Sequence, residues 1–281
     1  MKSSELLRAD ESAQVSVSAA SAMNELFHTE GVYSFKCFKS AEDMTLLWED
    51  EVAMNVVTYV GKNLLLQTGL TGSAYTVVGP YMGLISSVGW TPLSTTISSG
   101  IYTTGTGAVS LTTAASHGLL PGDTFTIASA AGTGSFAAIN GTFLATTGTT
   151  GTTLNFTIVS GLTMTITGGN VTTTSATRIN DTMASHATWT EAGSANAPTF
   201  AARVTPSFGT AASGTISTST AVNFTMSGAG TLQGAFIVLG SGAVSTIGST
   251  AGTLLSAGAF SGGSQPVVFG NIVQVTYSLS M

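Results

Sequence analysis

The residues best suited to chemistry in this sequence form one short cluster. His186 lies five residues from both Asp181 and Glu191, and together the three could supply ligands for a metal ion. A spacing of five residues matches neither one face of a strand nor the i, i+4 spacing of a zinc-binding helix. Two interpretations stay open: a metal site, or a polar loop with Trp189 packed beneath it. We favour the loop and expect no catalytic residue, no metal and no cofactor.

The other histidines and the cysteine indicate no reactive site either. His117 precedes Gly118 in a predicted turn, and we expect its ring to hydrogen-bond that turn. Cys37 is the one cysteine of the chain, so it has no partner for an intrachain disulfide. The many serines include none in a nucleophile-elbow sequence. The sequence therefore predicts a protein that is not an enzyme.

The densest run of charge is Glu49-Asp50-Glu51, which directly follows Trp48. On a strand, Glu49 and Glu51 share one face with Leu47, whereas Trp48 and Asp50 share the other face. One interpretation is a solvated strand edge that its charges protect against aggregation. The other is an acidic contact for a basic patch on a partner. Trp48, Glu49, Asp50 and Glu51 are thus the candidate partner-contact residues.

The charge of the chain is concentrated near its N-terminus. Charged residues make up 7% of the 281 residues, against about 25% in an ordinary soluble domain, and the net charge is -6. Residues 1–62 hold ten acids and five bases, whereas residues 63–281 hold only Asp123, Arg178, Asp181, Glu191 and Arg203. Because free cytosolic proteins usually carry a mixed charged surface, we favour a protein held in an assembly. The alternative is a Thr-rich β-protein that its hydroxyls keep soluble.

Nucleic acid and membrane are not expected as partners. Seven basic residues are too few to neutralise the phosphates of a nucleic acid. A membrane-spanning helix needs about 20 consecutive apolar residues, and the best candidate, residues 234–240, is far shorter. Residues 1–11 carry charges where a signal peptide needs its apolar region, so we expect synthesis in the cytoplasm.

Most of the chain predicts short strands separated by turns. Alternating or continuous apolar patterns mark strands at residues 31–38, 46–52, 123–127, 153–158, 221–226, 231–239 and 271–279. One helix is predicted over Asn55–Gln67, with Asn55 as its N-cap and Gly69 or Gly72 ending it; a short helical turn is possible at residues 21–28. The fold class is all-β: a jelly-roll-like β-sandwich core with one short helix.

Two hydroxyl-rich runs, residues 94–100 and 172–177, divide the chain. Between them, Pro121-Gly122-Asp123 predicts a turn before an alternating strand. The predicted organisation is an N-terminal arm at 1–28, a β-sandwich core from 29–98 plus 177–281, and an inserted small β-sandwich or barrel at 99–176.

Two sets of motifs are similar to known families. The segment His117–Ile127, followed by Asn140–Phe143, resembles a β module of phage and bacterial surface proteins. Most of the remaining chain resembles structural proteins of tailed phages, and the likeness rests on residues 47–52, 57–65, 81–85, 181–191, 252–260 and the last strand.

The resemblance implies a virion protein synthesised in the host cytoplasm, namely a head decoration (cement) protein on the capsid surface. Such a protein bridges and stabilises subunits of the major capsid protein. Closed symmetry is the usual case for self-association, so we expect a homo-oligomer, a dimer or trimer. The alternative is a tail-tip or fibre adhesin that binds cell-surface glycan, for which Trp90 and Trp189 are the candidates to stack on sugar.

Overall fold

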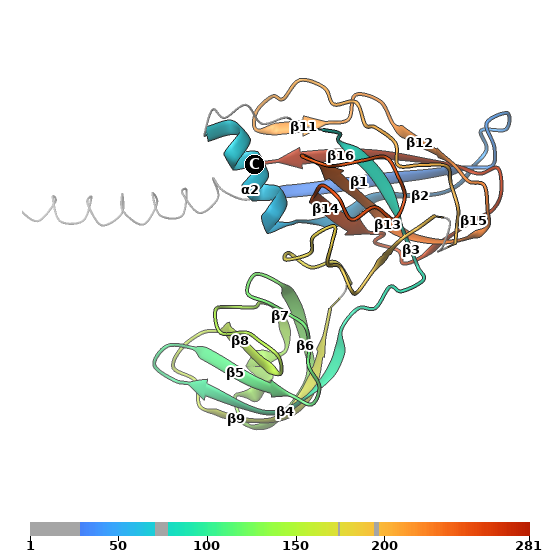
Figure 1. Cartoon of the computed structure of the whole chain (residues 1–281). Coiled ribbons are helices and arrows are strands. Elements are labelled where there is room, and N and C mark those ends of the chain that lie inside the picture. The colour runs from blue at the N-terminus through green and yellow to red at the C-terminus, as the bar shows by residue number, and fades with distance from the viewer. Residues whose placement is uncertain (1–28, 71–77, 174, 194–196) are drawn as a thin grey trace, which may run out of the picture.

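The computed structural model describes residues 29–70, 78–173, 175–193 and 197–281. The predicted arm and the helical turn at residues 21–28 lie outside this part of the chain. The described residues form two β-rich bodies, one above the other in the view of Figure 1. The all-β class is confirmed: within the described ranges, sixteen strands accompany one α-helix and one 3-10 turn.

The larger body, called the core here, contains ten strands that pair in one continuous sheet. Their order is β10-β3-β13-β14-β2-β1-β16-β11, with β12 beside β16 and β15 beside β13. The strands are β1 (Glu30–Phe38), β2 (Leu46–Val57), β3 (Tyr81–Ser86), β10 (Thr190–Glu191), β11 (Thr215–Ser217), β12 (Val222–Thr225), β13 (Gly230–Leu239), β14 (Thr253–Ala259), β15 (Gln265–Val267) and β16 (Ile272–Ser280).

The sheet folds into two layers, one with β1, β11, β12 and β16 and the other with β3, β10, β13, β14 and β15, and strand β2 joins them. Its first part pairs with β1, and Asn55–Val57 pair with β14. A register shift separates Asp50 from Ala53 in the pairing with β1, which marks a bulge, and bulges bend strands. One long strand therefore passes from one layer to the other.

The predicted start of the helix is wrong, and of its two predicted terminators Gly69 is wrong while Gly72 lies outside the described residues. Residues 55–57 are strand because their backbone pairs with β14, a contact that the local sequence does not reveal. The helix, α2 (Tyr59–Leu70), is capped by Thr58, whose hydroxyl accepts a hydrogen bond from the Gly61 N–H at 3.1 Å. It also continues through Gly69. A Cβ at Gly61 would lie 2.6 Å from the Leu255 carbonyl, so glycine lets the helix touch β14.

The space between the two layers is filled as the alternating patterns predict. The inward side chains of β12 and β16 are buried, and β13 is buried on both faces from Leu232 onward. One cluster joins Tyr33, Phe35, Phe224 and Tyr277 from one layer to Met82, Leu84, Leu232 and Ile237 from the other. Burying each large apolar side chain contributes about 1.5–3 kcal/mol.

The smaller body, called the insert here, is a six-stranded sheet with its own apolar core. Its order is β7-β6-β9-β4-β5-β8. The elements are β4 (Ser94–Thr103), β5 (Ala108–Thr113), β6 (Thr124–Gly134), η1 (Phe136–Ile139), β7 (Gly141–Leu144), β8 (Thr153–Thr157) and β9 (Met164–Thr172). The sheet curls toward a barrel, because the Thr146 N–H beyond β7 donates to the carbonyl of Asn155 in β8.

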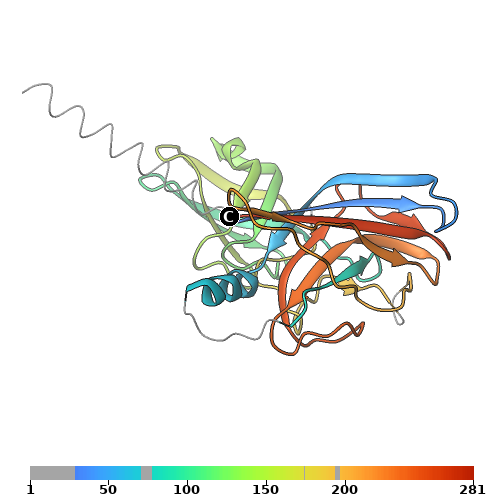
Figure 2. The same cartoon turned by 90° about the horizontal axis from the view of Figure 1, so that it is seen from above.

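The two ends of the core differ. Figure 1 and Figure 2 both place α2 and the C-terminus at one end and the turn between β1 and β2 at the other. Among the described residues, no helix has the length and apolar character to cross a membrane.

The chain enters and leaves the insert at neighbouring residues. The Leu93 N–H donates to the Thr173 hydroxyl at 2.9 Å, and the Thr173 N–H donates to the Leu93 carbonyl at 3.1 Å. The range 99–176 that the sequence predicts for the insert begins inside β4. Independent folding of the insert stays a prediction.

We predict that the core folds without the insert. Residues 94–172 would be replaced by an Asn-Gly dipeptide, which forms the tight turn that the antiparallel Leu93–Thr173 pair needs. The shortened chain should show one cooperative unfolding transition and native-like circular dichroism beside the full-length protein. Aggregation, or a non-cooperative melt, would show that core and insert form one folding unit.

Candidate functional site

Two of the four candidate partner-contact residues form hydrogen bonds within the core. Trp48 is half-buried; its indole N–H donates to the Pro266 carbonyl at 2.9 Å, and its ring packs edge-on against Phe260. Asp50 is buried, and its carboxylate accepts hydrogen bonds from the Ser261 N–H at 2.8 Å and from the Ser261 hydroxyl at 2.9 Å. Asp50 thus fastens β2 to the turn after β14.

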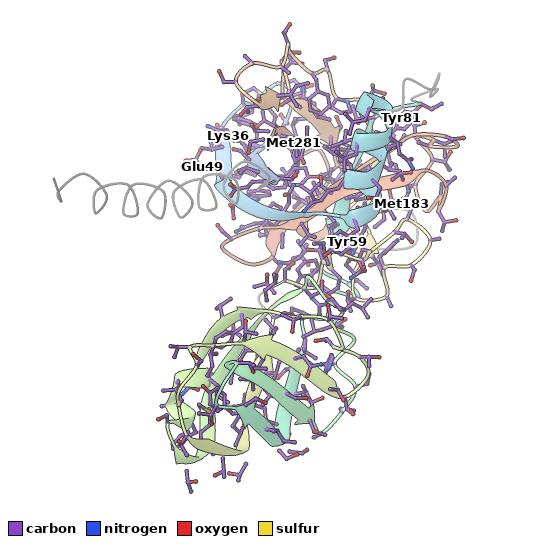
Figure 3. All side chains as sticks on the ribbon, turned by 90° about the vertical axis from the view of Figure 1, so that its left-hand side faces the viewer. Lys36, Glu49, Tyr59, Tyr81, Met183 and Met281 are labelled. Carbon is purple, nitrogen blue, oxygen red and sulfur yellow. The ribbon has the colours of Figure 1, made fainter. Side chains whose placement is uncertain are left out.

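The other two candidates are Glu49 and Glu51. Glu49 is exposed and pairs with Lys36 of β1 at 3.3 Å, and Figure 3 shows the two side by side. The side chain of Glu51 lies outside the described part. In the hairpin turn, the hydrogen bond from the Lys39 ammonium lowers the pKa of Asp43 to about 2. The role of Trp48–Glu51 in binding a partner stays a prediction.

Apolar side chains are exposed around this turn. We call them the hairpin tip: Met44, Leu46, Leu47, Val268 and Phe269. The two segments that supply them adjoin, because the Asn271 side-chain amide donates to the Lys39 carbonyl at 2.9 Å. Phe269 is 77% exposed, more than any other described aromatic residue. The sequence alone does not distinguish this surface, because the same residue types also fill the core.

All five charged side chains of residues 63–281 are buried. Their exposed fractions run from 3% to 8%: Asp123, Arg178, Asp181, Glu191 and Arg203. Within the described part, every exposed charge therefore comes from residues up to Lys62.

The strongest of the buried contacts joins Arg203 and Glu191. Two parallel hydrogen bonds of 2.8 Å connect the guanidinium and the carboxylate. The Gly248 N–H also donates to Glu191 at 2.7 Å, and Arg203 donates to the Ser249 carbonyl at 2.7 Å. A buried ion pair needs such additional bonds to offset the cost of desolvating both charged groups. Together these contacts hold the loop between β13 and β14 against β10.

The proposed chemical cluster separates into two structural contacts. Asp181 accepts the indole N–H of Trp189 at 2.8 Å, and burial raises the pKa of Asp181. His186 stacks on Trp189 with ring centroids 3.9 Å apart, while Glu191 binds Arg203. The polar loop over a buried Trp189 is confirmed. Within the described ranges, no group of three or more His, Cys, Asp or Glu residues could hold a metal ion.

His117 has the structural role that its position predicts. Its Nδ1 accepts the Leu119 N–H at 3.0 Å, so the proton of the neutral ring lies on Nε2 and is donated to the Thr153 carbonyl at 3.1 Å. Burial lowers the pKa of His117, which favours this neutral form.

Asp123 joins the insert to the core. One carboxylate oxygen accepts the Leu120 N–H at 2.9 Å within the insert, and the other accepts the Ile179 N–H at 2.9 Å in the returning chain. The Ile179 carbonyl in turn accepts the Tyr59 N–H at the start of α2, also at 2.9 Å. Burial raises the pKa of Asp123. The sequence identified this residue only as part of a turn.

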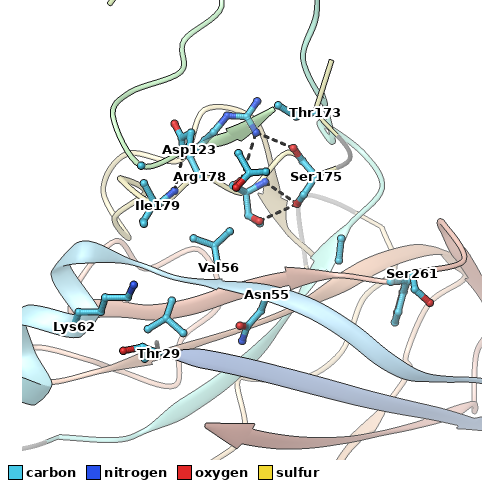
Figure 4. Close-up of a pocket in the computed structure, with 16 residues that line it drawn as sticks. Thr29, Asn55, Val56, Lys62, Asp123, Thr173, Ser175, Arg178, Ile179 and Ser261 are labelled. Carbon is cyan, nitrogen blue, oxygen red and sulfur yellow. Dashed lines mark hydrogen bonds between the residues drawn. The ribbon is translucent and has the colours of Figure 1, made fainter. Parts of the chain in front are cut away.

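A cleft of about 530 Å³ lies between core and insert, and Figure 4 shows it. Its floor contains Val56, Val57 and Phe260 of the core. The opposite wall is formed by the Gly122–Thr124 turn and by Thr173, Ser175 and residues 177–179 of the returning chain. Lys62 and Thr29 also line the cleft, and both are drawn at its left side in Figure 4.

Comparison with known proteins gives no relative: no family model, curated protein or solved structure matches the chain.

We predict that Asp123→Asn destabilises the protein by about 1–3 kcal/mol, because the amide can accept only one of the two N–H bonds and leaves the other donor buried without a partner. Urea unfolding measures the change in the free energy of unfolding. Asp43→Asn, in the exposed hairpin turn, is the control and should change it little. Equal stability of Asp123→Asn and the native protein would show that the carboxylate does not secure the joint.

Proposed function

We propose that this chain is a non-enzymatic virion structural protein of a tailed phage. In this proposal it decorates the capsid surface as a cement protein that bridges and stabilises major capsid protein subunits. The observation that carries the proposal is that residues 63–281 keep all five of their charges inside the fold. The similarity of the sequence motifs to tailed-phage structural proteins supports the virion as the setting.

An uncharged surface suits a protein that is covered by neighbours. Burying an unpaired charge at an interface is costly, whereas hydroxyls, amides and apolar groups desolvate at lower cost. The outward face of β12 and β16 shows this character, with Asn223, Thr225, Gln274 and Thr276 in the outward positions. We propose that such surfaces make the contacts of a dimer or trimer.

The hairpin tip is our proposed attachment surface for the capsid shell. Its exposed apolar side chains are flanked by the ion pairs Lys36–Glu49 and Lys39–Asp43. Protein interfaces commonly combine an apolar centre with a polar rim, and a few central side chains supply most of the binding energy. In this arrangement Phe269 is the central apolar contact and Glu49 belongs to the rim.

The adhesin alternative has less support. Sugar stacking needs an exposed aromatic ring, but Trp189 is 1% exposed, so its nomination as a sugar platform is wrong. Trp90 is half-buried and packs against a cluster that includes Trp189. The two tryptophans that the sequence nominated thus lend the adhesin no support.

Labelling of purified phage particles with gold-conjugated antibodies against the full chain tests the proposal. We expect gold over the heads in negative-stain images, with tails and particles of an unrelated phage unlabelled. Gold confined to tail tips would support the adhesin instead. Particles without label, together with absence of the chain by mass spectrometry of dissociated virions, would overturn a virion role.

A further inference from the structure

Lys62 differs from the other described lysines. Lys36 and Lys39 each form an ion pair with a carboxylate, but among the described residues Lys62 has no carboxylate within ion-pair distance. Its side chain is half-buried at the cleft between core and insert. A half-buried ammonium group without a counter-ion attracts a carboxylate more strongly than one in open water does.

The other charges lining the cleft are already engaged. Both oxygens of Asp123 accept backbone N–H groups. Arg178 donates to the Ser175 carbonyl at 2.7 Å and is 8% exposed. Of the two cations in the described walls of the cleft, Lys62 is therefore the more accessible to an added carboxylate.

The described part of the chain also begins at the cleft between core and insert. Thr29 lines the same cleft as Lys62. The 28 residues before it hold four acids and two bases, a net charge of -2 that complements Lys62. Glu25 is four residues before Thr29, a reach of about 13 Å for extended chain, and Leu26 and Phe27 follow it directly.

We propose that the segment Glu25–His28 of the same molecule binds in this cleft. The Glu25 carboxylate pairs with the Lys62 ammonium, and the apolar side chains of Leu26 and Phe27 cover the half-buried Val56 of the floor. Figure 4 shows Val56 pointing from the floor into the space beneath Ile179.

Occupation of the cleft would connect the two bodies of the protein. The floor belongs to the core, while the opposite wall includes the insert turn at Gly122–Thr124. A segment bound between them restricts rotation of the insert about the two chain segments that connect it to the core. The inference concerns the folded chain itself and does not depend on the proposed place in a virion.

Zero-length crosslinking of the purified full-length protein with a carbodiimide tests the proposal, because the reagent joins carboxylate and amine groups that are in contact. Tryptic peptides analysed by mass spectrometry should contain a Lys62–Glu25 crosslink. The pairs Lys36–Glu49 and Lys39–Asp43, at 3.3 and 2.8 Å, are internal positive controls. Glu25→Gln should abolish the Lys62 crosslink, whereas Glu5→Gln, the matched control, should retain it.

An equal mixture of isotopically labelled and unlabelled protein shows which molecule supplies Glu25. We expect crosslinks within labelled or within unlabelled chains and no mixed species. Mixed species, or crosslinking of Lys62 to another acid in place of Glu25, would overturn the assignment. The proposal also fails if both control pairs crosslink and Lys62 does not.

Discussion

A charge withdrawn from water must find partners inside the fold, and this constraint governs the protein beyond residue 62. Each of the five charged side chains in that region is buried and each makes specific bonds. The contacts fall at the places where irregular chain needs support: the joint between core and insert, the loop over Trp189, and the loop between β13 and β14. Removing one partner would leave the other charge buried without a bond, which is strongly destabilising. These contacts therefore stabilise the irregular segments that they join.

The same constraint explains the division of the surface. With its later charged side chains buried, the described part of the protein exposes charged side chains only on residues up to Lys62, chiefly around the β1–β2 hairpin. The remainder offers hydroxyls, amides and scattered apolar groups. Such a surface is poorly suited to a protein alone in solution and well suited to one packed among neighbours. The proposed decoration role rests on this division.

Sequence reasoning succeeded where local pattern determines structure. The period-two alternation of β12 and β16 and the continuous apolar run of β13 were enough to identify buried strands, and the glycine and proline of the turn before β6 predict its position. It failed at Asn55–Val57, where pairing with β14, some 200 residues later, overrides a helical pattern. The bonds of Asp123 to Ile179 and of Asp50 to Ser261 were equally hidden, because both join segments that are distant in sequence.

Covalent labelling of carboxylates tests the central claim most directly. The folded full-length protein would be treated with a carbodiimide and glycinamide, and modification of each acid followed by mass spectrometry. Asp123, Asp181 and Glu191 should remain unmodified while exposed Glu42 reacts, and all four should react once urea unfolds the chain. Modification of any of the three buried acids at the rate of Glu42 in the folded protein would contradict the account, because it would place charge on the surface beyond residue 62.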